Sequence, residues 1–278
     1  MNLSVKTALR YPGGKTRALK EILPLIPIDI EEFRDPFVGG GSVFLAVKQT
    51  TNASIFRIND LNYDLYCFWK QVKDNNNELV KELLEIKKNS SDGRKLYSDL
   101  KYQSLEQSSE FEVAVRFFVL NRITFSGLSC SGGYSKQSFE KRFTVSSIER
   151  LNALSSIIQN VEITNKGYEK LINTNEDDVF IFLDPPYLNA RNSKLYGNNG
   201  HLHTAFDHKT FAKRMKKCEC RWLITCDDTP EIREMFDFAQ IESWELQYGV
   251  NNMKKPDTSC KSKIGKELFI FNYNIKDK

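Results

Sequence analysis

The sequence predicts an α/β fold with a doubly wound, mostly parallel sheet, because short apolar segments alternate with segments of helical pattern. The segment Val179–Leu183 is apolar at every position, which is typical of a strand buried on both faces at the centre of a parallel sheet. Near the end of the chain only a basic loop separates two predicted strands, so we expect this pair to be antiparallel.

The individual elements follow from composition and period. Strands rich in β-branched and aromatic residues are expected at Ser54–Ile58, Val161–Thr164, Val179–Leu183, Trp222–Thr225, Trp244–Gly249 and Leu268–Tyr273. Helices are expected at Leu79–Lys87, Phe111–Leu120, Ser147–Ile158, Lys209–Lys217 and Pro230–Phe236. A further strand should end at the glycines of residues 39–41, with a helix after them.

The middle of the chain interrupts this alternation. Residues 75–109 are polar with a helical pattern, and residues 121–144 are rich in Ser, Gly, aromatic and basic residues, as in a long hairpin or loop. We therefore expect one domain built from residues 1–72 and 145–278, with an inserted second domain over residues 73–144.

Composition narrows the class of protein. No apolar segment of about 18 residues occurs, and the N-terminus lacks the apolar core of a secretory signal, so cytoplasmic residence is expected. The net charge of +4 is weak evidence for a nucleic-acid partner, although lysines cluster around residues 254–266. With six scattered cysteines, three histidines and no CxxC pair, we expect no metal; His201, His203, Cys218 and Cys220 are the alternative.

Two motifs in the first part of the chain favour a nucleoside ligand. The glycines at 39–41, between a strand and a helix, allow the backbone to approach a ligand closely. The motif has neither the third glycine of the dinucleotide fingerprint nor the lysine of a phosphate loop. Asp60, 19 residues after Gly41, can accept both hydroxyls of a ribose. The structural alternatives are a tight turn for the glycines and a helix N-cap for Asp60.

A third motif, Asp184-Pro185-Pro186-Tyr187, directly follows the buried strand, at the edge where parallel sheets bind ligands. Prolines have no N–H, so their carbonyls are left as acceptors. Two acceptors beside an aromatic face suit an exocyclic amine on a flat base. Such acceptors also stabilise the positive charge that grows on the amine as it attacks a sulfonium methyl group.

With these motifs, the chain resembles the Dam-type, or D12-class, adenine-N6 DNA methyltransferases of the α arrangement. The matching segments stand in the family's order at Tyr11–Lys15, Phe37–Ser42, Asn59–Asn62 and Asp184–Tyr187. The resemblance implies a Rossmann-like methyltransferase sheet with a helical and hairpin target-recognition insertion. It also implies a site-specific enzyme that uses S-adenosylmethionine, without a metal, to methylate the N6 amine of a flipped adenine in double-stranded DNA.

The resemblance assigns roles to individual positions. Those that would line the donor pocket are Tyr11, Lys15, Phe37, Gly39, Gly41, Asp60 and Asp184. The catalytic residues would be Asp184, Pro185, Pro186 and Tyr187, with Tyr187 stacking on the adenine. For contacts to DNA, the resemblance to the family's DNA-entering hairpin gives Arg122, Phe125 and Ser126, whereas local clustering of basic charge gives Lys136, Arg142, Lys254 and Lys255. Residues 225–228 align with a later motif of the family, without an evident role.

Several alternatives stay open at the level of sequence. The match to the GATC methylases ends after Cys130, so the target site is undetermined. A methyltransferase acting on RNA or on a protein amide is one competing class, and a DNA-binding protein on an inactive scaffold is another. Asp184 disfavours the protein-glutamine methylases, which tend to have Asn there, and intact Lys15, Asp60 and Asp184 disfavour the inactive scaffold. We expect a monomer, and a cognate restriction endonuclease is left open.

Overall fold

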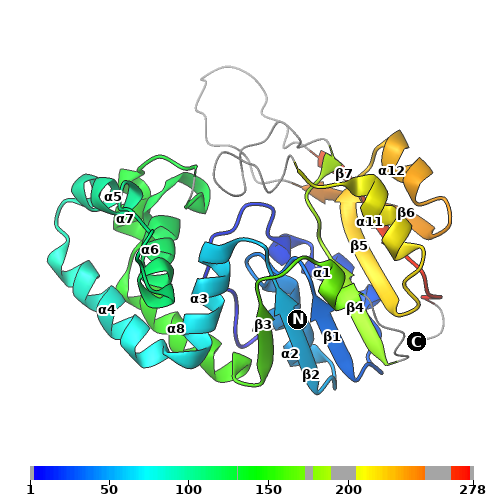
Figure 1. Ribbon diagram of the computed structural model, residues 1–278, viewed down its shortest axis with the longest axis horizontal. Helices are drawn as coiled ribbons and strands as arrows, with labels where there is room; N and C mark the ends of the chain where they lie inside the picture. Colours follow the sequence, from blue (N-terminus) through cyan, green and yellow to red (C-terminus); the bar gives the residue numbers. More distant parts are fainter. Residues whose placement is uncertain (1–2, 130, 173–177, 189–204, 248–263, 276–278) are drawn as a thin grey trace.

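A seven-stranded sheet forms the centre of the computed structural model, which describes residues 3–129, 131–172, 178–188, 205–247 and 264–275. The strand order is β3-β2-β1-β4-β5-β7-β6. The bounds are β1 (Glu32–Asp35), β2 (Ile55–Asn59), β3 (Val161–Thr164), β4 (Val179–Leu183), β5 (Arg221–Asp227), β6 (Gln240–Gln247) and β7 (Ile264–Phe271). Strands β1 to β5 pair in parallel, whereas β7 pairs antiparallel with β5 and β6. The predicted fold class is confirmed (Figure 1).

Strand β4 is buried on both faces, as its apolar sequence predicted. Phe180 and Phe182 enter one core, together with residues of α2 (Ser42–Thr50). Ile181 and Leu183 enter the other core, where they meet Phe211 of α11 (His208–Met215). This second core also holds Ile232 of α12 (Pro230–Met235). The strand thus sits between two layers of helices, with its carboxyl end at one edge of the sheet.

The last two strands pair antiparallel as predicted. Each begins four residues earlier than its apolar residues suggested. β6 begins at Gln240 rather than Trp244, and β7 begins at Ile264 rather than Leu268. Exposed Glu242 in β6 and exposed Lys266 in β7 explain the difference. Charged residues at the start of a strand interrupt its apolar pattern and conceal those first residues from a search for apolar segments.

The insertion is a group of helices beside the β3 edge of the sheet, at the left of Figure 1. The helices in this part of the chain are α3 (Tyr63–Asp74), α4 (Asn76–Asn89), α5 (Gly93–Lys101), α6 (Glu110–Ile123), α7 (Lys136–Arg142) and α8 (Val145–Ile158). A capping box between Ser109 and Glu112 starts α6, and Phe118 of α6 stacks on Phe68 of α3 at 5.9 Å. The predicted boundary at residue 72 falls inside α3, so the division at 72 and 144 stays a prediction.

The hairpin expected at residues 121–144 is only partly present. An isolated antiparallel bridge joins Thr124 to Tyr134, and the short helix η3 (Phe125–Gly127) turns the chain. Residues 136–142 form helix α7 instead of a hairpin strand, with the Ser135 side chain as its cap and Phe139 buried.

The remaining short elements lie near the N-terminus and after β3. They are η1 (Lys15–Arg17), α1 (Leu19–Ile22), η2 (Leu23–Leu25) and α9 (Glu169–Ile172). In the described part of the chain, no helix has the length and apolar character needed to cross a membrane.

Asn121 of α6 joins the insertion to the N-terminal segment. Its Oδ1 accepts a hydrogen bond from the Arg10 N–H at 3.0 Å, and its Nδ2 donates to the Arg10 carbonyl at 2.8 Å and the Gly127 carbonyl at 3.0 Å. Asn121 is fully buried, so these backbone groups have no ready access to water in its place. The amide therefore fixes the turn that carries Phe125 against the chain that leads into Tyr11.

We predict that Asn121→Ala lowers the free energy of unfolding by roughly 3 kcal/mol, because it leaves buried backbone groups without partners. Urea denaturation followed by circular dichroism measures this change. Asn152→Ala is the matched control, since exposed Asn152 lies on α8, and it should change the free energy by less than about 0.5 kcal/mol. Equal stability of the two variants would contradict the assignment.

Candidate functional site

A cavity of about 810 Å³ opens at the carboxyl edge of the parallel strands. Its walls come from the N-terminal segment, the loops after β1 and β2, the segment after β3 and the tetrapeptide after β4. The predicted residues in this lining are Tyr11, Lys15, Phe37, Gly39, Asp60, Asp184, Pro185, Pro186 and Tyr187. Gly41 is predicted to belong to the pocket but does not line it. Motifs far apart in the sequence therefore meet in one site.

The glycines of the β1–α2 loop are required by packing as well as by any ligand. Gly39 and Gly41 have φ values of 48° and 72°, in the left-handed region that favours glycine. A Cβ atom on Gly39 would lie 2.9 Å from the Tyr11 ring, and one on Gly41 would lie 2.6 Å from the Trp69 ring. The Trp69 indole N–H also donates to the Gly39 carbonyl at 3.1 Å. Gly41 thus shapes the loop from behind, which explains its absence from the lining.

Asp60 joins the two loops that form one wall of the cavity. Its Oδ2 accepts from the Gly39 N–H at 3.0 Å and its Oδ1 from the Asn62 N–H at 2.9 Å. Low-dielectric surroundings raise the pKa of Asp60 to about 6, although these two hydrogen bonds act in the opposite direction. The N-cap of α3 is Asn62, not Asp60, so the N-cap alternative is excluded.

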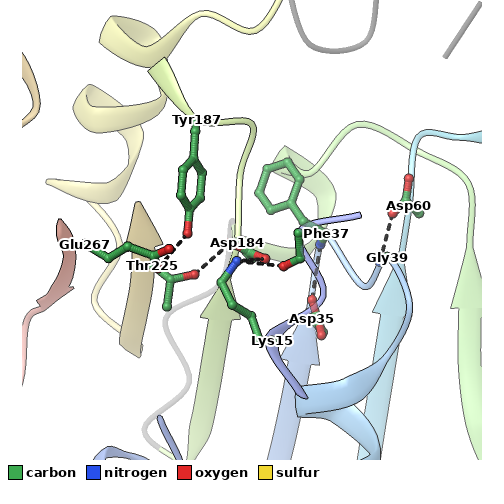
Figure 2. A network of polar contacts seen from close by, with 10 residues as sticks. Lys15, Asp35, Phe37, Gly39, Asp60, Asp184, Tyr187, Thr225 and Glu267 are labelled. Atoms are coloured by element: carbon green, nitrogen blue, oxygen red, sulfur yellow. Dashed lines mark hydrogen bonds and ion pairs between the residues drawn. The ribbon is translucent and has the colours of Figure 1, made fainter. Parts of the chain in front are cut away.

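The Asp184 carboxylate is held at both oxygens, as Figure 2 shows. Lys15 Nζ lies 2.6 Å from Oδ2, and the Thr225 hydroxyl donates to Oδ1 at 2.8 Å. Lys15 also donates to the Gly13 carbonyl at 3.1 Å, and its Nζ lies 5.0 Å from the centroid of the Tyr187 ring. Because a carboxylate oxygen has two lone pairs, each oxygen keeps capacity for a further donor.

The rest of the tetrapeptide is held from α11, β5 and β7. His208 Nε2 donates to the Pro186 carbonyl at 2.8 Å, and the Tyr187 hydroxyl donates to Glu267 Oε2 at 3.0 Å. The Leu188 N–H donates to Asp227 Oδ1 at 3.0 Å. The Pro186 carbonyl is thus an acceptor, as expected for both prolines, and its partner is His208.

Three residues that hold the tetrapeptide, Thr225, His208 and Glu267, had no predicted role. Thr225 belongs to the later family motif, so its position carried a signal, whereas His208 and Glu267 carried none. These contacts span 22 to 80 residues of sequence, which no local pattern can reveal.

Asp35 is a further acidic group beside the site, and no role was predicted for it. It ends β1, is 2% exposed and accepts from the Phe37 N–H at 3.3 Å. Burial, and next the nearby Asp184 carboxylate, raise the pKa of Asp35 well above its usual range. Asp35 therefore takes up a proton more readily than an exposed carboxylate does.

Three aromatic side chains, Phe37, Tyr168 and Phe206, form one side of the same cavity. Phe37 stacks on Tyr168 with ring centroids 5.5 Å apart, and Phe206 meets Phe37 edge-on at 5.8 Å. All three line the cavity, and only Phe37 was predicted. Flat apolar side chains near a carboxylate suit a planar heterocycle joined to a sugar.

Arg122 was predicted to contact DNA at the surface, but it lies in the interior of the protein. Arg122 is 4% exposed, its guanidinium donates to the Ala8 carbonyl, and it lies over the Phe118 ring at 5.3 Å. Burial, with nearby Arg150 and other arginines, lowers the pKa of Arg122 to about 9. This burial contradicts a direct DNA contact in the present conformation. Arg122 instead anchors the N-terminal segment to α6.

The other predicted DNA contacts that can be placed lie at the surface. Phe125 is 66% exposed, and Ser126 beside it has a φ of 54°. Lys136 and Arg142 are exposed on α7. Lys254 and Lys255 lie outside the described residues, as do His201 and His203. Among the residues that are described, no group of three acidic, cysteine or histidine side chains is arranged to hold a metal ion.

Comparison with known proteins agrees with the order of these motifs. A family model described as D12 class N6 adenine-specific DNA methyltransferase matches residues 11–250. The Type II methyltransferase M1.LlaDCHI of Lactococcus lactis subsp. cremoris is 26% identical over 222 residues, which cover 76% of this chain and 73% of that protein. The Type II methyltransferase M.CviBI of Paramecium bursaria Chlorella virus NC1A is 24% identical, covering 88% and 91%. The DNA adenine methylase of Escherichia coli (strain K12) is 24% identical, covering 88% of each.

Proposed function

Since the chain belongs to the D12 class of N6 adenine-specific DNA methyltransferases, we propose that the cavity beside Asp184 holds the methyl donor and the target adenine together. Membership of this family makes the protein a site-specific DNA methyltransferase that uses S-adenosylmethionine and acts on adenine. The observation that carries the assignment of the site is the Asp184 carboxylate, fixed by Lys15 and Thr225 in the cavity that Asp60 also lines.

The residues of the cavity fit the donor. A volume of about 810 Å³ lies in the range of sites for ligands of this size. Asp60 would accept the ribose hydroxyls, and Phe37 with Tyr168 would contact the adenine of the donor. Tyr11 and Gly39 would close the wall, with Gly41 supporting the loop from behind. When bound, S-adenosylmethionine supplies an electrophilic methyl group on a sulfonium.

The adenine amine is a weak nucleophile, because its lone pair is delocalised into the ring. Asp184 would make it a better one. Asp184 and the Pro185 carbonyl would accept its two N–H groups and favour a more tetrahedral nitrogen. Positive charge grows on that nitrogen only as the methyl group is transferred, so the carboxylate favours the transition state over the ground state. Lys15 and Thr225 fix the orientation of the carboxylate beforehand.

The target adenine must leave the DNA helix, because its amine cannot reach this cavity while the base is stacked. Tyr187 offers the aromatic face on which the flipped base would stack, and it lines the same cavity as Asp184. Pro186 keeps the backbone between them in one conformation, with its carbonyl bound to His208.

Residues 73–144 would form the target-recognition domain. Phe125, with Ser126 beside it, would fill the gap left by the flipped base, since it is exposed on a turn that Asn121 ties to the N-terminal segment. Exposed Lys136 and Arg142 on α7 would contact phosphates. Lys254 and Lys255 would add basic charge of the same kind.

A role in restriction and modification is supported by two relatives. Both are named type II methyltransferases, a term used for enzymes that protect the site of a cognate restriction endonuclease. The relative named DNA adenine methylase provides the alternative of a solitary enzyme. Sequencing of methylated DNA from expressing cells would identify the target site and so the endonuclease to test against it.

Donor affinity should depend on pH through Asp60. The pKa of Asp60 is raised to about 6, so the carboxylate that accepts ribose hydroxyls gains a proton as the pH falls below that value. We predict that the affinity for S-adenosylmethionine weakens about tenfold between pH 7 and pH 5. Asp60→Asn should bind about 10- to 100-fold more weakly at pH 7 and lose this dependence. Calorimetry at several pH values measures both effects, and a pH profile shared by the two proteins would exclude the role.

Catalysis should depend on Asp184. We predict that Asp184→Ala reduces single-turnover methyl transfer to duplex DNA by at least about 10²–10³-fold, because one preorganised acceptor is lost. Folding, checked by circular dichroism, and DNA binding should persist. Asp29→Ala is the matched control, because it removes an exposed carboxylate that does not line the cavity. This variant should transfer the methyl group at the wild-type rate. A folded Asp184→Ala enzyme within tenfold of wild type would show that the catalytic group lies elsewhere.

The wedge role of Phe125 has a matched control in Tyr102, which is 81% exposed in the same helical region. We predict that Phe125→Ala slows single-turnover transfer about 10-fold or more, because stacking by one aromatic side chain is worth about 1–3 kcal/mol. Tyr102→Ala should leave transfer unchanged. Equal rates for the two variants would remove Phe125 from the proposed interface.

A further inference from the structure

Glu267 is a buried acidic residue on a face of strand β7 whose next side chains are apolar. Side chains two residues apart on a strand share a face, so Glu267 lies on the same face of β7 as Phe269 and Phe271. Those two phenylalanines belong to the larger core, and Glu267 itself is 2% exposed. A buried carboxyl group lowers stability unless it is hydrogen-bonded, so a glutamate at this position needs a physical reason.

The register of the sheet brings Glu267 to the catalytic edge. β7 runs antiparallel to β5, and Glu267 pairs with Asp227 at the carboxyl end of β5. The first half of β7 therefore lies beside the carboxyl end of β5, which in turn pairs with β4, the strand that Asp184 follows. Glu267 lines the cavity and accepts the Tyr187 hydroxyl at 3.0 Å. Figure 2 shows the Tyr187 side chain with its hydroxyl directed at Glu267.

We propose that Glu267 is a positioning residue, which fixes the Tyr187 ring at the angle needed to stack on the flipped adenine. A tyrosine side chain turns about two torsions, and its ring is joined to the backbone at one end. The hydroxyl oxygen lies on the axis of the second torsion, so a hydrogen bond there fixes the first torsion directly. Because a phenol O–H prefers the plane of its ring, an acceptor on one side also favours one orientation of the ring about the second torsion. Pro185 and Pro186 already restrict the preceding backbone, so this bond acts on a side chain whose attachment point is defined. The proposal rests on the stacking role proposed for Tyr187.

The neighbouring strand supports the same segment. Asp227, the partner of Glu267 in the β5–β7 register, accepts the N–H of Leu188, which follows Tyr187. One carboxylate therefore holds the backbone after the tetrapeptide, and the other holds the tyrosine hydroxyl. Lys15 Nζ, 5.0 Å from the Tyr187 centroid, adds a contact to the ring. The antiparallel end of the sheet thereby contributes directly to the geometry of the base pocket.

A double-mutant cycle between Glu267 and Tyr187 tests the proposal. Glu267→Met keeps the length of the side chain and suits the apolar face of β7, but it removes the acceptor. We expect it to slow single-turnover transfer about 10- to 100-fold at saturating donor, with unchanged donor affinity. Glu267→Gln, whose amide oxygen still accepts, should stay within about threefold of wild type. In a Tyr187→Phe background, Glu267→Met should cause no further loss.

Fluorescence of 2-aminopurine at the target position adds a readout that a merely structural role would not move. Stacking on an aromatic ring quenches this base, so emission in the DNA complex should rise in Glu267→Met and in Tyr187→Phe. Glu242→Ala, which removes an exposed glutamate from edge strand β6, is the matched control and should behave as wild type.

Three results would overturn the proposal: wild-type transfer by Glu267→Met, a loss in Glu267→Gln as large as in Glu267→Met, or a further loss in the Tyr187→Phe background. These outcomes are distinct from failure of the proposed site. If Asp184→Ala and Tyr187→Ala are fully active while the wild-type enzyme methylates adenine, the site lies elsewhere. If those two variants are impaired and Glu267→Met is not, only the inference about Glu267 fails.

Discussion

The ion pair between Lys15 and Asp184 is the contact on which the arrangement of the site depends. It joins residues 169 positions apart, with 2.6 Å between Nζ and Oδ2, and so brings the N-terminal segment to the carboxyl end of the central strand. Asp35 lies close enough to Asp184 for its own pKa to be raised, and the ammonium of Lys15 acts in the opposite direction. The ammonium of Lys15 thus lies near two acidic side chains at the carboxyl edge of the sheet. It also approaches Tyr187, so the tetrapeptide after β4 and the N-terminal motif form one unit.

The glycine-rich loop shows that packing and ligand binding can select the same residues. Tyr11 lies so close to Gly39 that a Cβ atom could not be placed there, and Trp69 excludes one from Gly41. The tight-turn explanation and the ligand explanation for these glycines are therefore compatible. A loop pressed between two aromatic rings is held rigidly, and a rigid loop lets Asp60 keep its carboxylate in one position.

The N-terminal segment also connects the donor side of the molecule to the helical insertion. Arg122 binds the Ala8 carbonyl and Asn121 binds both backbone groups of Arg10, directly before Tyr11 of the cavity. Both side chains come from the last turn of α6, which leads into the turn that bears Phe125. Arg122 is thereby used internally, although motif resemblance predicted a contact to DNA. Phe125 in the turn that follows stays exposed.

The sequence by itself determined the features that depend on local pattern. The apolar run of β4 predicted its burial on both faces, and the position of Asp184 after that run predicted the functional edge. The basic loop before β7 predicted the antiparallel end, although Glu242 and Lys266 concealed where β6 and β7 begin. Only the tertiary structure decided that Arg122 is buried, and that Thr225, His208 and Glu267 hold the tetrapeptide. The physical reason is that periodicity records which face of an element is buried, whereas a contact between distant side chains depends on strand order and register. Those are settled only when the whole sheet and its helices pack together.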